Sequence, residues 1–387
     1  MPLKDKTVMS QKKELVAACL QSKESGHSIS ALAREAGVSR ASCYRWMAQH
    51  QAGGDLSPAS TRPDHSPRKI SGETEQQILD LHKQFPHFGS RKIKHKIKTN
   101  NDDQAAPSHQ TIVSVLRNHG LIKPRKKSRK FPPRKNPLTI AEAPNDVFAI
   151  DFKGDFLTQD GVRNKFLTMM DCASRYVFLS RHLDRMTTSY VLGAVIEVFQ
   201  EYGLPLVMRS DGGSPFGTTG YRGFSALSLN CIKLGIHYER ITPGRPQENG
   251  RLERYHRTLK EETMMPPAAT AVEQQTRTDG FVRHYNEGRP HQALNFATPH
   301  SQYTRSPRKY PGYIPEVEYS NEYEVRKVCK KGLISFRGEE YILSKVFQGE
   351  PIGLLETPTG DFDIYFGVQR IGGLYRNGQI FEPLLEP

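Results

Sequence analysis

The sequence is poor in the features that mark secreted, membrane-spanning or zinc-binding proteins. Its 387 residues include only five cysteines, and no two of them have C-x-x-C spacing. No apolar run approaches the ~18 residues that a membrane span needs. The first 16 residues also lack the apolar core of a signal peptide. These absences argue against a disulfide framework, a structural zinc site and a membrane partner, and they predict a cytoplasmic protein.

Acidic charge is scarce relative to basic charge, and the imbalance lies at one end of the chain. The sequence carries 55 Lys and Arg against 41 Asp and Glu, a formal net charge of +14. Residues 1–140 hold 26 basic and 11 acidic residues, whereas residues 141–387 hold 29 and 30. The whole basic excess therefore lies in the first third, and it predicts a polyanionic partner, with nucleic acid ahead of an anionic membrane.

The densest basic segment is a proline-containing linker, residues 123–140. Eight of its first 13 residues are Lys or Arg and none is acidic. A solvated linker that is basic by chance is the alternative, but so many uncompensated charges between two folded segments favour contact with phosphates. The residues predicted to make this contact are Lys123, Arg125, Lys126, Lys127, Arg129 and Lys130.

A small helical unit is predicted in residues 1–50. Ser30 can cap a short helix, Gly37 can supply a turn, and Ser39 can cap a second helix. This pattern is typical of a helix-turn-helix whose second helix enters the major groove, and a plain helical hairpin is the alternative. A linker rich in Gly, Pro and Ser follows over residues 51–69. The residues predicted to face DNA are Arg40, Ser42 and Arg45.

A second helical unit is predicted over residues 70–122. An amphipathic helix at 73–83 is followed by two short helices that Ser90 and Ser108 can cap, and Gly120 ends the last of them. We interpret this unit as a second, winged helix-turn-helix.

Alternating apolar strands and helices begin near residue 145. Three strands precede a helix, and the pattern then alternates between strand and helix up to a closing helix that begins after Pro246, which predicts a mixed α/β sheet. The strands are predicted at 147–152, 165–170, 176–179, 205–209 and 236–239, and the helices at 188–202, near 221–234 and after 246.

Two aspartates follow strongly apolar strands of this sheet. Asp151 ends the first strand, and Asp211 lies just past the fourth, in a Ser-Asp-Gly-Gly turn that lets a phosphate approach the backbone. A third acid on the closing helix would complete an oxygen-ligand cluster for Mg²⁺. By the same reasoning Asp155 or Asp171 could replace Asp151, and a turn or cap role is the common explanation for any one such aspartate.

Four segments resemble transposases and retroviral-type integrases of the DDE class, and more narrowly bacterial insertion-sequence transposases with an integrase core. They are FAIDFKGDF, RSDGGSPF, ITPGRPQENGRLERYHRTLK and YNEGRPHQALNFATPHSQY, and the likeness covers roughly residues 25–305. It implies a multidomain chain with N-terminal all-α helix-turn-helix units and a central α/β ribonuclease-H-like integrase core over residues 141–305. A strand-rich segment over 320–387 then predicts a small C-terminal β-barrel, for contact with DNA or protein.

The resemblance places the third acid on Glu253, four residues after the asparagine of the N-G motif. Glu248 is the alternative, because 36 residues separate it from Asp211, close to the family's usual spacing, whereas 41 separate Asp211 from Glu253. Five helical positions turn the two glutamates about 140° apart, so at most one faces the aspartates. The N-G-R-L-E-R context selects Glu253, and Asn249, one turn earlier, is predicted to orient it or to contact DNA.

The family also implies a reaction. Asp151, Asp211 and Glu253 would hold two Mg²⁺ ions about 3.5–4 Å apart, with Mn²⁺ able to substitute. Water would nick the transposon end, and the freed 3′-hydroxyl would join that end to target DNA, with no covalent protein–DNA intermediate.

The resemblance also implies double-stranded DNA as partner, both transposon ends and target. A homo-multimer is expected on that DNA, in the nucleoid of a bacterial cytoplasm. The alternatives are a non-catalytic DNA-binding regulator with an integrase-like fold, and a simple ribonuclease-H-type nuclease, for which two DNA-binding units would be excessive.

We predict that residues 1–140 recognise the transposon ends. A fragment of this region should footprint the terminal repeats by itself, and its affinity should fall on the order of a thousandfold or more between 50 and 200 mM salt. Arg40→Ala or Arg45→Ala should relax sequence preference, whereas Lys126→Ala or Lys127→Ala should weaken binding evenly across sequences. Footprinting that located end recognition only in residues 141–387 would refute this assignment.

Overall fold

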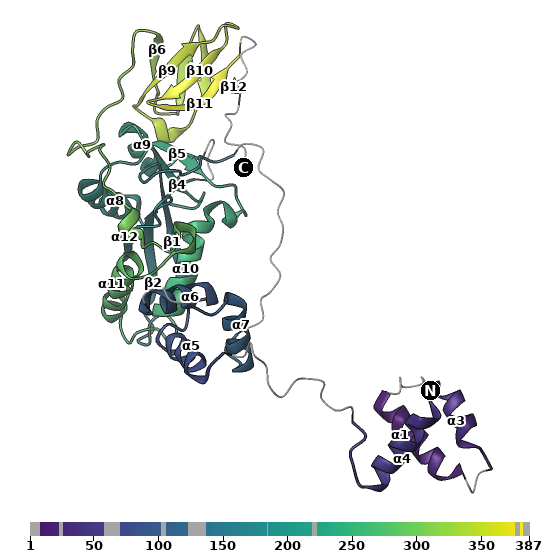
Figure 1. Ribbon diagram of the computed structural model, residues 1–387. Helices are drawn as coiled ribbons and strands as arrows, with labels where there is room; N and C mark the ends of the chain where they lie inside the picture. Colours follow the sequence, from purple (N-terminus) through teal and green to yellow (C-terminus); the bar gives the residue numbers. More distant parts are fainter. Residues whose placement is uncertain are drawn as a thin grey trace. The chain divides into compact units, whose positions relative to one another are not determined.

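The computed structural model describes two compact units, which contain residues 1–69 and 70–387 (Figure 1). The described residues are 8–22, 26–57, 70–101, 106–122, 137–183, 185–218, 223–375 and 380–381. Within these ranges no helix is long and apolar enough to cross a membrane. The linker residues predicted to contact phosphates lie outside the described residues; they are Lys123, Arg125, Lys126, Lys127, Arg129 and Lys130.

In its described residues, the first unit has three helices around a small core of Cys19, Ala33 and Cys43. Its helices are α1 (Val8–Leu20), α3 (Ile29–Glu35) and α4 (Arg40–Gln51). Ser39 caps α4 as predicted, because its hydroxyl accepts a hydrogen bond from the Ser42 N–H at 3.1 Å. The preceding helix starts earlier than predicted, since Ser28 rather than Ser30 is its cap.

The second unit begins with three more helices, whose shared core includes Ile78, Ile93, Ile97 and Ile112. They are α5 (Gly72–Gln84), α6 (Ser90–Asn100) and α7 (His109–Asn118). Ser108 caps α7 as predicted. The described part of residues 70–122 contains no strand, so the predicted wing stays a prediction.

A five-stranded sheet of order β3-β2-β1-β4-β5 follows. Strands β1, β2 and β3 pair antiparallel, whereas β1, β4 and β5 pair parallel. The predicted mixed sheet is therefore confirmed, with strand ends shifted by a few residues. The strands are β1 (Val147–Leu157), β2 (Arg163–Asp171), β3 (Val177–His182), β4 (Val207–Ser210) and β5 (His237–Arg240).

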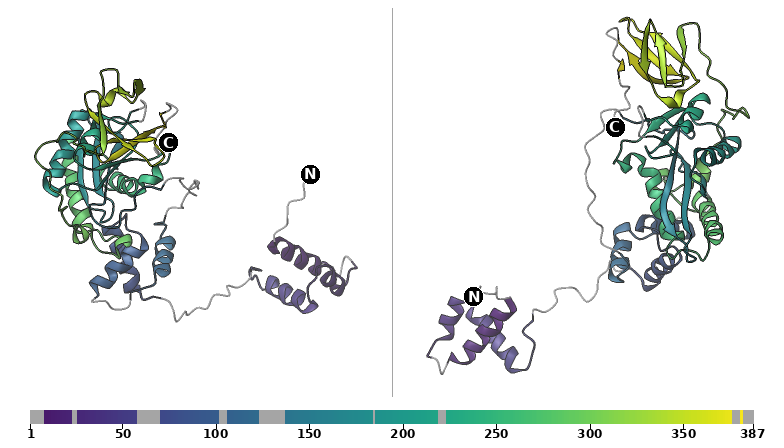
Figure 2. Two further views of the ribbon diagram at one scale, coloured as in Figure 1. Left: turned by 90° about the horizontal axis from the view of Figure 1, so that it is seen from above. Right: turned by 180° about the vertical axis from the view of Figure 1, so that it is seen from behind.

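Helices cover both faces of this sheet (Figure 2). Phe148 and Ile150 of β1 join a core cluster with α8 (Thr188–Tyr202) and α9 (Ala226–Lys233). Val147 and Ala149 point the other way, into a cluster with α10 (Gly250–Thr263) and α11 (Ala271–Glu287). Because alternate residues of a strand face opposite sides, the unbroken apolar start of β1 reflects burial on both faces.

The C-terminal strands form an open sheet. The predicted strand-rich segment is confirmed, but β6, β9, β10, β11 and β12 pair in the order β12-β11-β10-β9-β6, and β7 pairs with β8 separately. In the described residues no ladder joins β6 to β12, so a closed barrel is not confirmed. The strands are β6 (Tyr323–Lys327), β7 (Leu333–Phe336), β8 (Glu339–Ile342), β9 (Pro351–Glu356), β10 (Phe362–Phe366), β11 (Gln369–Leu374) and β12 (Ile380–Phe381).

Packing against the central domain explains how an open sheet buries its apolar side chains. Phe347 packs edge-on against Phe224, with ring centroids 5.4 Å apart. Lys233 of α9 forms an ion pair with Glu350 at 2.6 Å. The apolar residues of the C-terminal sheet thus continue into the core cluster of α8 and α9 instead of closing on themselves.

Asp171 and Asp155, the two alternatives to Asp151, have other partners. The Asp171 carboxylate is fully buried and accepts hydrogen bonds from the Asn145 N–H at 2.9 Å and from both the N–H and the hydroxyl of Ser174 at 2.6 Å. The Asp155 carboxylate is paired with Arg163 and Lys165 at 3.0 and 3.1 Å. Asp171 therefore has a structural role in the turn after β2, and Asp155 belongs to a surface ion-pair network.

We expect Asp171→Ala to lower the free energy of unfolding by about 2–3 kcal/mol, because it leaves buried donors without an acceptor. Asp155→Ala is the matched control and should change stability little, since surface ion pairs contribute little. Urea unfolding followed by circular dichroism measures both. Equal effects of the two substitutions would contradict the structural role of Asp171.

Candidate active site

Asp151 lies in the middle of β1, which continues to Leu157 and so does not end at this acid as predicted; Asp211 lies just past β4, where the parallel pairing with β1 stops. Val147 is level with Val207 and Ala149 with Arg209 in this pair. Continuing the register by two residues brings Asp151 level with Asp211, the first residue after β4. The sheet therefore places the two aspartates side by side although 59 residues separate them in the sequence.

Glu253 reaches the same place from another element. It lies in the first turn of α10, which packs on the sheet beside β1, and its side chain is exposed. Burial, followed by the nearby carboxylates of Asp211 and Glu253, raises the pKa of Asp151 to about 7. A buried carboxylate whose pKa is raised beside two other acids is a site that attracts a cation.

His256 joins this group, and the sequence prediction did not include it. Asp151, Glu253 and His256 each offer a ligand atom, and all three atoms lie within 4.8 Å of one another. Burial lowers the pKa of His256 to about 3, with a further contribution from Lys153, so the imidazole is neutral. The spacing in the sequence could have indicated this residue, because residues three apart on a helix share a face and His256 lies three residues after Glu253.

The Asp211 loop rests on Arg240 of β5. A Cβ atom on Gly212 would come within 2.8 Å of the Arg240 guanidinium, and one on Gly217 within 2.8 Å of the Gly212 carbonyl oxygen. The Gly213 N–H donates to Asp211 Oδ1 at 3.2 Å. That the Gly212-Gly213 turn admits a phosphate stays a prediction; in the structure, Gly212 and Gly217 let the arginine and the loop approach closely.

Glu248, the alternative third acid, is occupied elsewhere. It lies in the short 3₁₀ helix η1 (Pro246–Asn249), and its carboxylate accepts from the Thr242 N–H at 2.7 Å and from the Thr242 hydroxyl at 3.1 Å. These bonds close the turn that leads into α10, which supports Glu253 as the third acid. Asn249 is only 3% exposed, a burial that does not favour the predicted contact with DNA.

Lys153 lies close to the carboxylates, and Lys260 lies close to Lys153. Burial lowers the pKa of Lys153, and so does the neighbouring charge of Lys260, while Glu253 and Asp151 raise it. Lys153 follows Asp151 by two residues in β1, and sequence reasoning missed it as a site residue.

In the first unit, the residues predicted to face DNA differ in accessibility. Arg40 and Arg45 are exposed on α4. Ser42 is half-buried, and its hydroxyl lies 2.9 Å from that of Ser39, within the cap of the helix. The two arginines are thus free to reach DNA, whereas Ser42 helps to start the helix that carries them.

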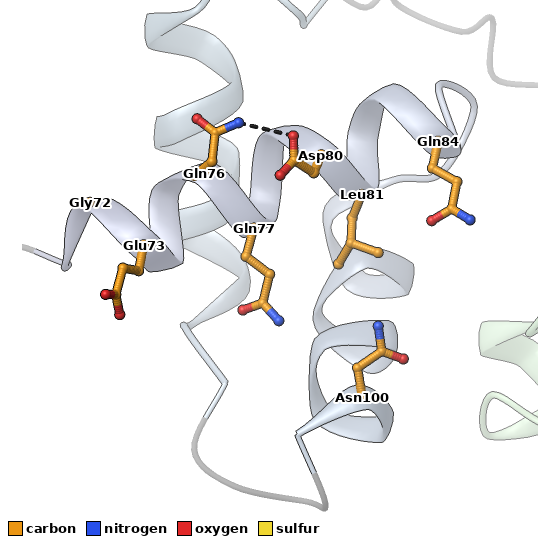
Figure 3. A pocket seen from close by; sticks show the side chains of 8 residues that line it. All are labelled: Gly72, Glu73, Gln76, Gln77, Asp80, Leu81, Gln84 and Asn100. Carbon is orange, nitrogen blue, oxygen red and sulfur yellow. Dashed lines mark hydrogen bonds between the residues drawn. The ribbon is translucent and has the colours of Figure 1, made fainter.

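The second helical unit presents different surfaces. A hollow along α5 is lined by Glu73, Gln76, Gln77 and Asp80, and Gln76 donates to Asp80 at 2.9 Å (Figure 3). This lining includes two acids and no Lys or Arg, so it does not suit a phosphate.

The basic helix α6 instead faces the central domain. His95 stacks on Phe296, with ring centroids 4.8 Å apart. Burial lowers the pKa of Lys92 to about 7, followed by the effect of Arg289. Arg289 also pairs with Glu262 of α10 at 2.5 Å. These contacts tie the second helical unit to the helix that carries Glu253.

Comparisons with known proteins agree with this arrangement. Two family models described as an integrase core domain match residues 141–246 and 234–299. A helix-turn-helix domain matches residues 11–64, and a homeodomain-like domain matches 42–116. The class of protein predicted from the sequence is thus supported: an insertion-sequence transposase with an integrase-like core.

The C-terminal residues match a more specific family model. Residues 323–379 match the C-terminal domain of IS481 family transposases. The chain is 26% identical over 240 residues to the "Insertion element IS407 uncharacterized 31.7 kDa protein" of Burkholderia multivorans, covering 62% of this chain and 82% of that protein. It is 24% identical to the "Insertion element IS476 uncharacterized 39.2 kDa protein" of Xanthomonas euvesicatoria, covering 58% of this chain and 62% of that protein.

Solved structures give a weaker likeness. The catalytic core domain of HTLV-2 integrase in complex with magnesium is 13% identical, with a TM-score of 0.33, and covers 42% of this chain and 98% of that one. A chain of the simian T-cell lymphotropic virus intasome in complex with the PP2A regulatory subunit B56 gamma is 16% identical, with a TM-score of 0.37. That match covers 79% of this chain and 96% of that one. At these TM-scores the likeness carries no argument about the site.

The raised pKa of Asp151 predicts a pH-dependent stability. Between its ordinary pKa of 3.8 and its folded value of about 7, the folded chain holds a proton that the unfolded chain releases. The free energy of unfolding without metal should therefore fall as pH rises through that window. Asp151→Asn removes this cost, so its stability advantage over the wild type should grow by on the order of 1–3 kcal/mol between pH 4 and pH 8.

Urea unfolding in chelator-containing buffer measures this difference. Asp155→Asn is the control, because hydrogen bonding to Lys165 lowers the pKa of Asp155 below its ordinary value of 3.8, so its stability difference from the wild type should stay nearly constant between pH 4 and pH 8. A constant difference between Asp151→Asn and the wild type across this range would contradict the prediction.

Proposed function

We propose that the chain is a transposase that binds transposon ends and catalyses Mg²⁺-dependent DNA end cleavage and strand transfer. Asp151, Asp211 and Glu253 are its catalytic residues. The observation that carries the proposal is the convergence of these three carboxylates, from β1, from the loop after β4 and from α10, in a chain that matches the integrase core models.

The residues at this place fit divalent cations. Asp151, Glu253 and His256 offer ligand atoms within 4.8 Å of one another, and the Asp211 carboxylate adds its charge to that of Asp151. Carboxylate oxygens are the ligands that Mg²⁺ prefers, and Mn²⁺ accepts the same set. When bound, such ions activate the attacking oxygen and stabilise the leaving one.

The chain's own residues account for access and orientation. Glu253 is exposed, so DNA can reach the acids from solvent. Lys153 and Lys260 would hold the scissile phosphate beside them. Tyr255 lies two residues after Glu253 on α10 and is 1% exposed. It packs edge-on against Tyr285, with ring centroids 5.0 Å apart. A buried tyrosine cannot attack DNA, which supports water and a 3′-hydroxyl as the nucleophiles.

The two helical units supply DNA binding in this proposal. Arg40 and Arg45 would read the transposon ends, and the linker after residue 122 would follow the phosphates. A non-catalytic regulator with an integrase-like fold is not favoured, because a regulator has no need of three converging carboxylates.

We expect Asp151→Asn, Asp211→Asn and Glu253→Gln each to reduce both end cleavage and strand transfer to background while DNA binding survives. The amides keep the shape of the side chains and remove the charge that a metal ion requires. Cleavage and joining of labelled transposon-end DNA, with a parallel binding assay, measure the three effects.

Glu248→Gln is the matched control for Glu253→Gln. Glutamine keeps an oxygen that can accept from Thr242, so this variant should retain most activity. If Glu248→Gln were inactive and Glu253→Gln active, the assignment of the third acid would be wrong.

We also propose that the chain acts as a homo-multimer on DNA, because joining two ends to one target requires two active sites and each chain carries one. A catalytically inactive Asp151→Asn chain mixed with a chain that cannot bind ends should restore activity that neither has alone. Mass photometry of the active complex gives the copy number, and a single copy per complex would overturn the proposal.

A further inference from the structure

His256 lies where the carboxylates converge, but the acids alone do not explain its position. It is one turn after Glu253 on the same face of α10, and it is 4% exposed. Its Nδ1 atom faces Asp151, 3.9 Å from Oδ2. A histidine that is only part of the core would not need to aim a ring nitrogen at an acidic site.

Thr168 fixes which ring nitrogen carries the proton. It lies opposite Asp151 in the β1–β2 pair, and its hydroxyl is 2.9 Å from the Asp151 carbonyl oxygen and 2.6 Å from His256 Nε2. A carbonyl oxygen can only accept, so the hydroxyl donates its single proton there. Nε2 must then donate to the hydroxyl, which leaves the lone pair on Nδ1.

The distance from Nδ1 to Asp151 suits two ligands of one ion. At 3.9 Å the two atoms are too far apart for a hydrogen bond. Two donors that each lie about 2.1 Å from one metal ion can be up to about 4.2 Å apart. A histidine whose second ring nitrogen donates to a fixed oxygen is also the usual arrangement of a metal-binding histidine.

We propose that His256 Nδ1 is a metal ligand of this site, together with Asp151 and Glu253, and that it makes the site prefer Mn²⁺ to Mg²⁺. This inference rests on the proposed function, because it assigns a further ligand to the same site. Mg²⁺ favours an all-oxygen shell, whereas transition-metal ions accept imidazole nitrogen more readily. Thr168 is a positioning residue, because it acts on the metal through His256.

The test is pulsed electron paramagnetic resonance of the full-length chain with less than one equivalent of Mn²⁺. We expect ¹⁴N modulation from a directly bound imidazole in the wild type and its loss in His256→Gln. The matched control is His237→Gln, which removes an exposed histidine at the start of β5 and should leave the modulation unchanged. Circular dichroism confirms that each variant is folded.

Titration of Mn²⁺ against Mg²⁺ gives a second readout. The ratio of Mn²⁺ to Mg²⁺ affinity should fall about tenfold or more in His256→Gln. Thr168→Val keeps the imidazole and removes the oxygen that orients it, so it should weaken Mn²⁺ binding by roughly tenfold. It also keeps the inference testable if His256→Gln fails to fold.

The outcomes separate this inference from the proposed function. Mn²⁺ binding that depends on Asp151 and Glu253 but shows no ¹⁴N modulation, or modulation that survives His256→Gln, would overturn the role of His256 and leave the carboxylate site intact. Mn²⁺ binding that is unaffected by Asp151→Asn and Glu253→Gln would instead refute the proposed catalytic site, and this inference with it.

Discussion

The burial of Asp151 in β1, beside two other carboxylates, is the constraint on which the rest of the site depends. Asp151 is largely buried beside two other acids, and its raised pKa expresses the cost of that placement. A fold tolerates such a cost only where the surrounding structure holds the groups in place. Here the sheet register holds Asp151 beside Asp211, and the packing of α10 on the sheet holds Glu253. A bound divalent cation would offset the free-energy cost of ionising Asp151 beside the other two carboxylates.

Helix α10 connects the site to other parts of the chain. Its N-terminal half carries Glu253 and His256, while Glu262 near its end pairs with Arg289, which lies over the ring of Phe88 at 5.1 Å. The helix that presents the third acid is therefore in contact with the second helical unit. In the proposed function, the element that binds DNA and the element that completes the active site are joined by side-chain contacts.

Sequence reasoning succeeded where the signal was local. The apolar strand 147–152, the helix 188–202 and the cap at Ser39 depend on periodicity and capping within a few residues, and all three are present. The sequence was less informative about the C-terminal sheet, because the closure of a barrel depends on pairing between strands that are distant in the sequence. The C-terminal strands were predicted, but their assembly into a barrel was not confirmed, since their apolar face packs on α9.

The sequence alone determined the class of protein, the order of its elements and the position of Asp211 just past a strand, because these depend on motifs and on short-range periodicity; it placed the end of β1 at Asp151, whereas the strand continues to Leu157. The folded structure decided which acids are free for chemistry: Asp171 accepts from Asn145, 26 residues away in the sequence, as well as from Ser174 in its own turn, and Glu248 accepts from Thr242. It also decided the role of His256, because only the pairing of β1 with β2 brings Thr168 to its ring. A side chain's chemistry depends on neighbours that are distant in sequence, and folding alone brings those neighbours together.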